Sequence, residues 1–370
     1  MNRRHRAMSD EWLRRYFGAE ARLDFRPLRG NDWLTDGIWR VTDGSRSVIA
    51  KTVSARSRRH DDTWSAHWTQ GGNDLAHWNY WKREYLVYHS DIPSQFARSG
   101  VHAPALLGAT ESTDSVTMFL EDCDLTPATS WRASGYCAAA RDLGLAQGEL
   151  SSRGKVASQP WFCSNYMRDY ALEKPFDRHV VASDEIWLDL VETGVVTPQA
   201  RDRQVRFAQN ELQLLALLNM APFTLCHNDY WTRNLFGGSA GTTTVIDWAF
   251  VGFGPMGADV ANLVASAGFD GFVAAAELDA FSEQVFEAYL AGLRGAGWKG
   301  DERAVRLGYL ASAAKYAWVV AAMLTSSATP GHPIYVGYGN GRHLNFHAVA
   351  TTLNLLATWS DVALALAETV

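Results

Sequence analysis

Cysteine is scarce in this sequence and follows no recognisable pattern. The 370 residues include only 4 cysteines, at positions 123, 137, 163 and 226, and no two of them form a C-x-x-C pair. Such scattered thiols exclude a disulfide framework and are typical of a protein in a reducing cytosol. Cys226 and His227 are adjacent, but no second Cys/His pair at ligand spacing accompanies them, which argues against a zinc site.

Two further features are missing, namely a long apolar run and an excess of basic residues. The best apolar stretches, such as residues 316–324, fall short of the roughly 20 residues that cross a bilayer. The basic N-terminus is not followed by the apolar segment of a secretory signal. The 34 basic side chains are outnumbered by 40 acidic ones, whereas nucleic-acid binders carry a basic excess. We therefore expect a cytoplasmic protein that has neither a membrane nor a nucleic acid as its partner.

What is present is the composition of an ordinary globular chain. It is 47% hydrophobic and 20% charged, with an unusual 15 tryptophans. Its length corresponds to about two to three domains or to one large two-lobed unit. Residues 37–42 and 45–53 carry β-branched and aromatic side chains on either side of Asp43-Gly44, which predicts a hairpin. Further elements expected in this first third are a helix at 80–89 and strands at 105–110 and 115–120.

The rest of the chain has mainly helical periodicity. Helices are expected at 134–151, 198–220, 273–293, 302–326 and 342–368. Thr197 and Pro198 supply an N-cap and a first-turn proline for the second of these helices. Its apolar face is expected to contain Val205, Ala208, Leu212 and Leu215. The sequence thus predicts an α+β fold with a small β-rich N-lobe (1–120), a hinge (121–129) and a larger α-helical C-lobe (130–370), with ligands bound between the lobes.

Within the helical part lies a strand–loop–strand segment that places acidic residues in loops. Asp229 and Asp247 each follow a short apolar strand, and Asn234 lies five positions beyond Asp229. Carboxylate and amide oxygens are suitable ligands for Mg²⁺. One carboxylate and one amide can hold a metal on a nucleotide, leaving the other carboxylate to receive a hydroxyl proton, as phosphoryl transfer to an alcohol requires. The alternative is that these side chains only cap turns at strand ends.

The two loops also match a known pattern. Residues 227–234 (HNDYWTRN) resemble the H-x-D-x-x-x-x-N catalytic loop of the aminoglycoside phosphotransferase and choline kinase-like family, whose members are relatives of the protein kinases. Residues 245–248 (VIDW) are similar to the family's I-D-W segment, and Gly254, Pro255 and Asp259 fit its G-P-x-x-x-D continuation. Two motifs in this order are more specific than either alone. The resemblance implies a protein kinase-like fold with two lobes.

The resemblance implies a role for each matching residue. Asp229 would be the catalytic base or would orient the substrate hydroxyl. His227 would brace the catalytic loop without reacting, and Asp259 would anchor that loop from the following helix. Asn234 and Asp247 would ligate Mg²⁺.

The resemblance also implies a nucleotide site on the N-lobe side. Lys51 would contact the α- and β-phosphates of ATP and so serve both binding and catalysis, with Glu84 as its helix partner. Asp74 or Glu111 could compete for the place of Glu84, and Lys51 could instead be a solvated strand lysine. The hinge backbone that hydrogen-bonds adenine would be formed by Glu121, Asp122 and Cys123.

Two segments depart from the family pattern. No G-x-G-x-x-G precedes the hairpin, so the candidate phosphate loop is the segment 31–37. The segment between Lys51 and Glu84 is longer than expected and contains Trp64, Trp68, Trp78 and Trp81. Such a tryptophan-rich stretch more often packs against the protein or forms a mobile lid than binds a partner.

Together these observations predict an ATP- and Mg²⁺-dependent O-phosphotransferase that acts on a hydroxyl of a small polar metabolite or antibiotic. One alternative acceptor is a Ser or Thr of a ribosomal, lanthipeptide-like precursor peptide, which would involve a partner enzyme in a biosynthetic pathway. A second alternative is a pseudokinase-like scaffold, although each mapped catalytic position holds a competent residue. Acidic side chains at 165–178 and 183–193 could line a pocket for a cationic acceptor, but exposed helix faces look the same.

Overall fold

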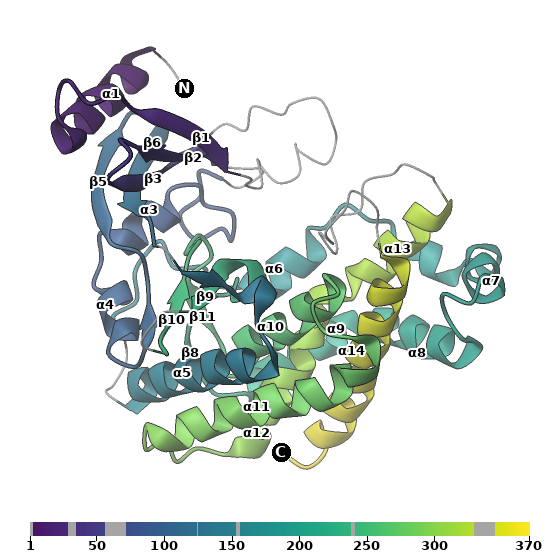
Figure 1. Cartoon of the computed structure of the whole chain (residues 1–370). Helices are drawn as coiled ribbons and strands as arrows, with labels where there is room; N and C mark the ends of the chain where they lie inside the picture. Colours follow the sequence, from purple (N-terminus) through teal and green to yellow (C-terminus); the bar gives the residue numbers. More distant parts are fainter. Residues whose placement is uncertain are drawn as a thin grey trace.

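The computed structural model describes residues 3–28, 35–55, 72–123, 125–152, 156–237, 241–328 and 345–370. Most of the candidate phosphate loop (31–34) lies outside this part of the chain, as do Trp64 and Trp68 of the tryptophan-rich stretch. The described residues form an α+β structure with a β-rich lobe built from the first third of the chain and a larger helical lobe built from the rest (Figure 1).

The N-lobe is built on one antiparallel sheet of five strands in the order β1-β2-β3-β6-β5. These strands are β1 (Asp24–Leu28), β2 (Thr35–Thr42), β3 (Ser47–Ser54), β5 (Leu106–Glu111) and β6 (Ser115–Glu121). The predicted hairpin is the β2–β3 pair. Its turn forms because the Asp43 carboxylate accepts the amides of Ser45 and Arg46, while Gly44 takes the positive φ of 91° that glycine favours.

Helices cover the two faces of this sheet. α1 (Arg3–Phe17) packs on one face, where Trp12 stacks on Phe119 with ring centroids 3.9 Å apart (Figure 1). On the other face, Trp81 and Tyr85 pack against Met118 and its neighbours. The expected helix at 80–89 is shorter in the structure, because α3 (Arg83–Tyr88) begins only after a series of turns.

The segment after α3 leaves the N-lobe and joins the helical lobe. α4 (Ile92–Ala97) packs against the C-lobe helix α5 (Ala133–Ser152), and β4 (Val101–His102) pairs in parallel with β10 (Thr243–Val245). The large core of the C-lobe accordingly includes Ile92, Phe96 and Val101. We propose a division into an N-lobe (1–120), a hinge (121–129) and a C-lobe (130–370), with residues 92–102 packed into the C-lobe.

The C-lobe is centred on the closely packed helices α5 and α11 (Leu278–Gly295) (Figure 1). They approach because glycines lie at the contact. A Cβ at Gly292 would lie 2.1 Å from the carbonyl oxygen of Arg141, and one at Gly144 would lie 2.2 Å from that of Tyr289. Further C-lobe helices are α10 (Ala258–Phe269), α12 (Glu302–Ala311), α13 (Trp318–Ala328) and α14 (Phe346–Ala367). α14 agrees with the expected segment 342–368, the expected helix at 302–326 is divided into α12 and α13, and α10 is absent from the segments expected from periodicity.

The expected helix at 198–220 differs from the prediction. It is divided at Asn210 into α8 (Pro198–Gln209) and α9 (Glu211–Leu217). Of the predicted apolar face, Leu215 is buried and Val205 and Ala208 pack against the core, but the prediction is wrong for Leu212, which is 60% exposed. The other buried positions of the two helices and the turn after them are Gln204, Phe207, Glu211, Leu214 and Leu218. The predicted N-cap is present, because Thr197 Oγ1 accepts the amide of Ala200 at 3.2 Å.

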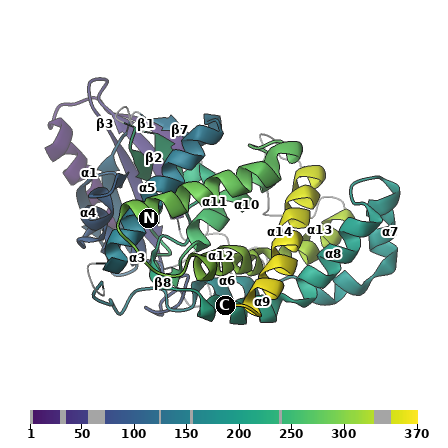
Figure 2. The same ribbon diagram turned by 90° about the horizontal axis from the view of Figure 1, so that it is seen from below.

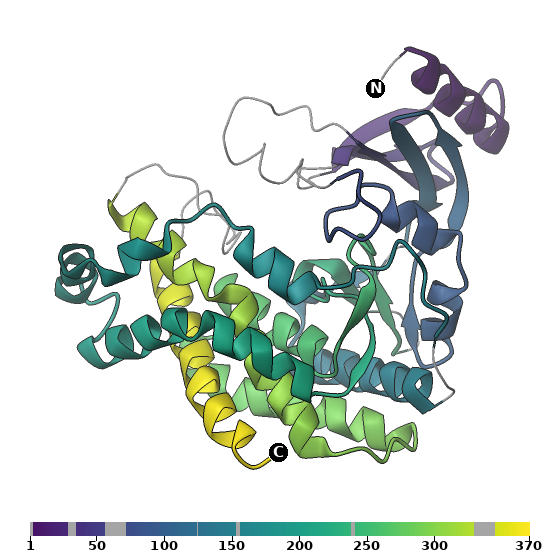
Figure 3. The same cartoon turned by 180° about the vertical axis from the view of Figure 1, so that it is seen from behind.

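Short strands and 3₁₀ turns flank the loops that lie between the lobes. β7 (Thr126–Pro127) and β9 (Leu235–Gly237) complete a sheet in the order β4-β10-β9-β7, while β8 (Phe223–Cys226) pairs with β11 (Gly252–Pro255). α6 (Tyr166–Leu172) lies near this region, whereas α7 (Asp184–Glu192) lies at the end of the molecule away from the N-lobe sheet (Figures 1, 2 and 3). The 3₁₀ turns are η1 (Ala128–Ser130), η2 (Arg178–Ala182), η3 (Leu218–Met220), η4 (Thr232–Asn234), η5 (Ala275–Glu277) and η6 (Ser312–Tyr316).

Residues 316–324 lie in the helical run of α12, η6 and α13, which covers the helical segment expected at 302–326. Among the described residues, Glu302–Ala328 and Phe346–Ala367 are long and apolar enough to cross a membrane by length and composition alone. The most apolar window of the first segment is completely buried, and more than half of that of the second is buried too. Core helices of globular proteins have the same properties, so these segments are explained by packing inside the C-lobe.

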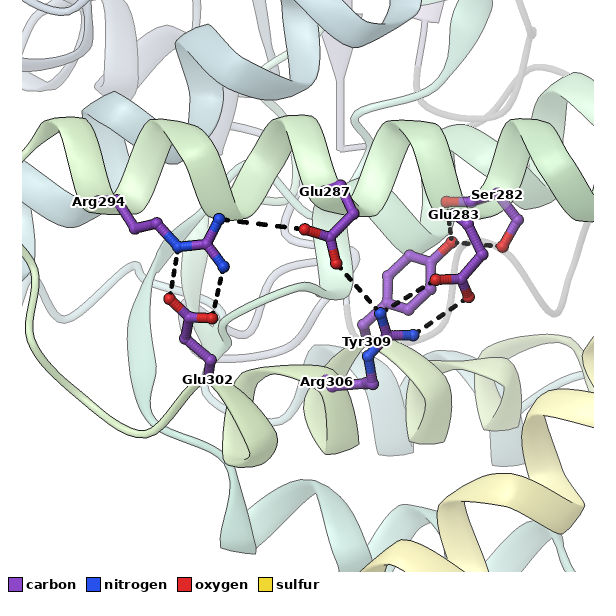
Figure 4. A network of polar contacts seen from close by, with 7 residues as sticks. All are labelled: Ser282, Glu283, Glu287, Arg294, Glu302, Arg306 and Tyr309. Atoms are coloured by element: carbon purple, nitrogen blue, oxygen red, sulfur yellow. Dashed lines mark hydrogen bonds and ion pairs between the residues drawn. The ribbon is translucent and has the colours of Figure 1, made fainter.

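Ion pairs link α11 and α12 at the surface (Figure 4). Arg294 binds Glu302 at 2.6 Å, and Arg306 binds both Glu283 and Glu287, at 3.0 and 3.3 Å. Beneath them, the Ser282 and Tyr309 hydroxyls form a buried hydrogen bond of 3.0 Å. Exposed ion pairs contribute little individually, at most about 1 kcal/mol each. An apolar contact also joins the two helices, since the rings of Phe286 and Tyr309 lie with centroids 4.6 Å apart.

Candidate active site

Two loops with unusual backbone geometry form the base of the site. Asn228 follows β8, Asp247 follows β10, and both have a left-handed φ of 64°. Within the described part of the chain, they are the non-glycine residues with positive φ. Such a conformation costs free energy that the surroundings must offset, and it is often found at functional sites. Asn and Asp tolerate it best, because their short polar side chains bond locally.

Two of the predicted site residues, Asp229 and Asn234, are in direct contact in the first loop. Asn234 Nδ2 donates to Asp229 Oδ2 at 2.8 Å and to the Asp229 carbonyl oxygen at 3.0 Å. η4 makes this contact possible, because its turn brings the two side chains back toward each other. Burial raises the pKa of Asp229, while the charge of Lys315 and the bond from Asn234 oppose that rise.

His227 holds the same loop from inside. Its Nδ1 accepts the amide of Asp229 at 3.2 Å, and its ring packs edge-on against Trp248 with centroids 4.7 Å apart. Burial lowers the pKa of His227 to about 4. A neutral, buried ring that already accepts a backbone hydrogen bond is suited to bracing the loop, not to proton transfer.

Asp259 binds the loop from the N-terminus of α10. Its carboxylate accepts the amide of His227 at 2.9 Å and that of Asn228 at 2.7 Å. Gln147 of α5 donates to the same carboxylate at 3.0 Å and accepts from Tyr289 at 2.6 Å. Burial raises the pKa of Asp259 to about 6, against the opposing effect of the two amides. Helices α5, α10 and α11 thus all contribute to fixing the loop that carries Asp229.

Lys51 connects the two lobes across the cleft. Its ammonium lies 2.7 Å from Glu84 Oε2 of α3 and 2.9 Å from Asp247 Oδ1 of the C-lobe. Burial opposes the positive charge, but Asp247 and Glu84 outweigh it and raise the pKa of Lys51. Burial raises the pKa of Glu84, and the attraction of Lys51 opposes this rise. Because Lys51 is held charged, we take the contact with Glu84 to be an ion pair.

The two competing acids do not reach Lys51. Glu111 pairs with Lys82 at the surface, and Asp74 caps a local turn by accepting the amide of Ala76 at 3.0 Å. The structure therefore places Glu84, and neither alternative, beside Lys51.

The acidic side chains of the hinge form hydrogen bonds with the N-lobe. The Asp122 carboxylate accepts Arg40 Nη2 at 2.8 Å and Ser47 Oγ at 2.6 Å, which fastens the hinge to the N-lobe sheet. Glu121 ends β6 and exchanges bonds with Ala105. Burial and the neighbouring carboxylates raise the pKa of the Cys123 thiol to about 11, so it is un-ionised. The bonds of Glu121 and Asp122 thus connect the hinge to the N-lobe.

The site has oxygen donors for a metal carried by a nucleotide. In the described residues, no three His, Cys, Asp or Glu side chains gather at metal-binding distance. Asn234 lies in the loop after β8, and the side chain of Asp247 is 38% exposed. Such a pair fits a divalent cation whose remaining ligands are phosphate oxygens and water.

Sequence reasoning missed two buried cations near Asp229. Lys315 of η6 and Lys174, which follows α6, are both almost completely buried, and each interacts electrostatically with Asp229. A lysine within the apolar run at 313–324 was the available signal for Lys315, because a charge in such a run requires a buried partner. No comparable signal marks Lys174.

The acidic residues suggested for a cationic acceptor do not form one group. Glu173 is bound by Trp78 Nε1 at 2.6 Å, and Asp184 pairs with Arg201. α7, which carries most of the others, lies away from the N-lobe (Figure 3). The structure does not support an acidic wall built from that helix.

Comparison with known proteins gives one family match. A model described as "Phosphotransferase enzyme family" matches residues 91–299, which is more than half of the chain. The match contains the loops of Asp229 and Asp247, while Lys51 and Glu84 precede it. No curated protein matches the sequence.

Solved structures match the chain over nearly its whole length. An amicoumacin kinase in complex with AMP-PNP, Ca²⁺ and its ligand is 13% identical, with a TM-score of 0.52 over 98% of this chain and 96% of that one. A spectinomycin phosphotransferase in complex with ADP and spectinomycin is 11% identical, with a TM-score of 0.51 over 96% and 98%. At these identities the likeness shows the fold alone, which is the protein kinase-like fold expected from the sequence.

Proposed function

Since the chain belongs to the phosphotransferase enzyme family, whose reaction is phosphoryl transfer to a hydroxyl, we propose that it uses Mg²⁺ and ATP to phosphorylate a small polar metabolite or antibiotic. The observation that carries this proposal is the Lys51 contact. One ammonium joins Glu84 of the N-lobe to Asp247 of the C-lobe, at 2.7 and 2.9 Å, while Asn234 bonds to Asp229 in the neighbouring loop.

Asp229 is the proposed base and orienting group. The acceptor oxygen bonds to the γ-phosphorus as the bond to the β–γ bridging oxygen breaks, and the hydroxyl proton passes to an Asp229 oxygen. Asn234 fixes that carboxylate through its bond to Oδ2. The transition state of phosphoryl transfer is loose, so most of the catalytic effect comes from positioning and charge neutralisation.

Lys51 and the hinge hold the nucleotide in this proposal. Lys51 contacts the α- and β-phosphates, and Glu84 keeps it directed into the cleft. Backbone groups of Glu121, Asp122 and Cys123 hydrogen-bond adenine. Asn234 and Asp247 would hold the Mg²⁺, which when bound neutralises charge on the phosphates.

The described structure favours a small acceptor over a peptide. Peptide capture depended on an exposed tryptophan-rich stretch, but Trp78 and Trp81 are buried in the protein. No described residue indicates a partner enzyme. Two proteins of this fold are named as kinases of antibiotics, which supports the same class of acceptor here. We further propose a cytoplasmic location, in keeping with the scattered free thiols.

Calorimetric titration with ATP, with and without Mg²⁺, tests the nucleotide site. We expect wild type to bind ATP in a Mg²⁺-dependent manner and Asp247→Asn to lose that dependence. Asparagine suits this position because it tolerates the left-handed φ of 64°. Asp229→Asn is the matched control, since it should retain binding of Mg·ATP but lose transfer.

Two results would contradict the proposal. The nucleotide site would be refuted if wild type failed to bind ATP in the presence of Mg²⁺. Full turnover by Asp229→Asn on an acceptor that wild type phosphorylates would refute the role of Asp229 while leaving the nucleotide site intact. A pseudokinase-like scaffold would show binding of a partner but no turnover by wild type.

A further inference from the structure

Four aromatic rings form a closed group near the loop that carries Asp229. Trp78 contacts Tyr170 and Phe250, with ring centroids 5.3 and 5.9 Å apart. Tyr166 contacts the same two rings, with centroids 5.3 and 5.4 Å apart. The rings come from three separate segments, namely the turns before α3, helix α6 and the turn after β10, and we call them the aromatic wall.

Printed-sequence neighbours of the proposed base connect it to the aromatic wall. Asn228, which immediately precedes that base, donates from Nδ2 to the carbonyl oxygen of Phe250 at 2.8 Å. The Asn228 carbonyl accepts from Lys315 Nζ at 3.2 Å, and this ammonium lies 4.9 Å from the ring centroids of Tyr166 and Tyr170. An acceptor whose hydroxyl reaches the proposed base therefore has the aromatic wall as a neighbour.

The four rings of the aromatic wall are not equally buried. Trp78 and Tyr166 are each 2% exposed, and Glu173 fixes Trp78 by accepting its Nε1 proton at 2.6 Å. Tyr170 and Phe250 are only partly buried, so part of each ring is open to a ligand. Pockets for small molecules are commonly lined by aromatic side chains in a preformed arrangement. The buried pair thus supports the two rings that an acceptor can contact.

Two lysines of the protein already lie against the aromatic wall. Lys174 Nζ lies 3.5 Å from the ring centroid of Tyr170 and 4.9 Å from that of Trp78. Lys174 and Lys315 are both almost completely buried. Aromatic faces attract cations, but here two ammonium groups take that place, and they repel a further cation nearby. The wall therefore disfavours an amine and favours an uncharged ring that stacks on Tyr170 and Phe250.

The acidic residues of α6 and its C-terminal end do not reverse this preference. Glu173 accepts Trp78 Nε1 and lies 3.2 Å from His77 Nε2. Asp169 interacts electrostatically with His77 and Arg168. Groups of the protein that donate protons or carry positive charge therefore already face these two carboxylates.

We propose that Tyr170 and Phe250 bind the acceptor and select hydroxyl compounds that carry an uncharged aromatic ring over compounds that carry an amine. The ring of the acceptor stacks on these two side chains while its hydroxyl lies at Asp229. The proposal rests on the proposed function, because it names the class of acceptor for the same site. It adds no chemical step to the transfer reaction.

A set of glucosides that differ only in the aglycone tests this selection. Phenyl, methyl and 2-aminoethyl β-D-glucoside offer the same sugar hydroxyls beside an aromatic ring, a small neutral group and a cation. Calorimetry measures the binding of each glucoside to the protein loaded with Mg·AMP-PNP. Release of ADP from Mg·ATP, above the release with water alone, measures kcat/KM for each glucoside as an acceptor. We expect the phenyl glucoside to exceed the methyl glucoside by about tenfold or more in both measurements, and the aminoethyl glucoside to be the weakest.

Leucine variants of the two rings show whether the preference comes from the aromatic wall. Tyr170→Leu and Phe250→Leu remove a ring but keep an apolar side chain. We expect either change to lower the preference for phenyl over methyl glucoside to less than about threefold, with the KM for ATP unchanged. Phe25→Leu is the matched control, because Phe25 is 47% exposed on β1 of the N-lobe, and it should keep the wild-type preference. If one wall variant fails to fold, the other decides.

Several results would overturn this proposal. They are equal affinity for the phenyl and methyl glucosides, a preference for the aminoethyl glucoside, and a phenyl preference that both wall variants retain. The absence of binding by all the glucosides, in protein that binds Mg·AMP-PNP, would overturn it as well. Failure of wild type to bind Mg·ATP would instead refute the proposed function, so the two failures are distinguishable.

Discussion

At the scale of single residues, the carboxylates near the cleft differ because their neighbours differ. Asp247 faces Lys51, whereas Asp229 is bound by Asn234 and lies in front of Lys315. Glu84 is buried, and its charge is compensated by Lys51 at 2.7 Å. These surroundings, more than the residue types, assign a different task to each acid.

The Glu84–Lys51 pair gives a prediction at this scale. Glu84→Gln removes one of the two carboxylates that hold the buried ammonium. Lys51 is then held by Asp247 alone, and we expect kcat/KM for ATP to fall by about tenfold or more, because a buried charge that loses its partner is strongly disfavoured. Steady-state kinetics measure the effect.

Glu111→Gln is the matched control for this change. Glu111 was the competing candidate in sequence, but it pairs with Lys82 at the surface. Its loss should change activity by less than about twofold, since an exposed pair contributes at most about 1 kcal/mol. Equal effects of the two substitutions would show that the buried ion pair has no special role.

At the scale of elements, the close contact between α5 and α11 depends on residues without side chains. Gly292 of α11 lies against the backbone of α5 and Gly144 of α5 lies against the backbone of α11. Gln147 of α5 binds Asp259, and Tyr289 of α11 binds Gln147. The distance between the helices therefore affects how the catalytic loop is anchored.

Gly292→Ala tests that contact. The added Cβ would lie 2.1 Å from the Arg141 carbonyl oxygen, so the helices must separate, and we expect a loss of about 2–3 kcal/mol in the free energy of unfolding. Gly295→Ala in the same helix is the control. Its Cβ meets Leu145 at an ordinary 3.5 Å, and the helix propensity of alanine should make it neutral or stabilising by up to about 1 kcal/mol. Urea unfolding of both variants measures the difference, and equal stabilities would contradict the role of the glycine contact.

At the scale of the whole molecule, Arg83 fastens segments of both lobes together. It is completely buried and donates to five carbonyl oxygens, those of Leu75, His77, Trp78, Trp161 and Ala249. Ala249 lies two residues after Asp247, so the same guanidinium connects the segment before α3 to the loop of Asp247. A planar guanidinium with five donors suits such a junction better than lysine would.

Arg83→Met should therefore destabilise the protein as a whole. Several buried carbonyls would lose their donor, and we expect the free energy of unfolding to fall by about 3 kcal/mol. Arg98→Met, at an exposed position, should change it by less than about 0.5 kcal/mol. Chemical denaturation compares the two variants. A small effect of Arg83→Met would show that packing, and not these hydrogen bonds, joins the lobes.

The sequence by itself determined the parts of this protein that depend on neighbours in the chain. The β2–β3 hairpin follows from the turn chemistry of Asp43-Gly44, and the start of α8 follows from Thr197-Pro198. The family and the two-lobed fold followed from two short motifs in order. Turns, caps and short loops are local, so their residues specify them directly.

The tertiary structure alone decided which distant residues meet. Lys51 and Asp247 are 196 positions apart, and Lys315 and Asn228 are 87 apart. Tertiary packing also places Glu84, and not Asp74 or Glu111, beside Lys51. The exposure of Leu212 on α9 depends on it as well. The physical reason is that contacts over such separations depend on the relative placement of whole helices and strands, which no local spacing in the sequence encodes.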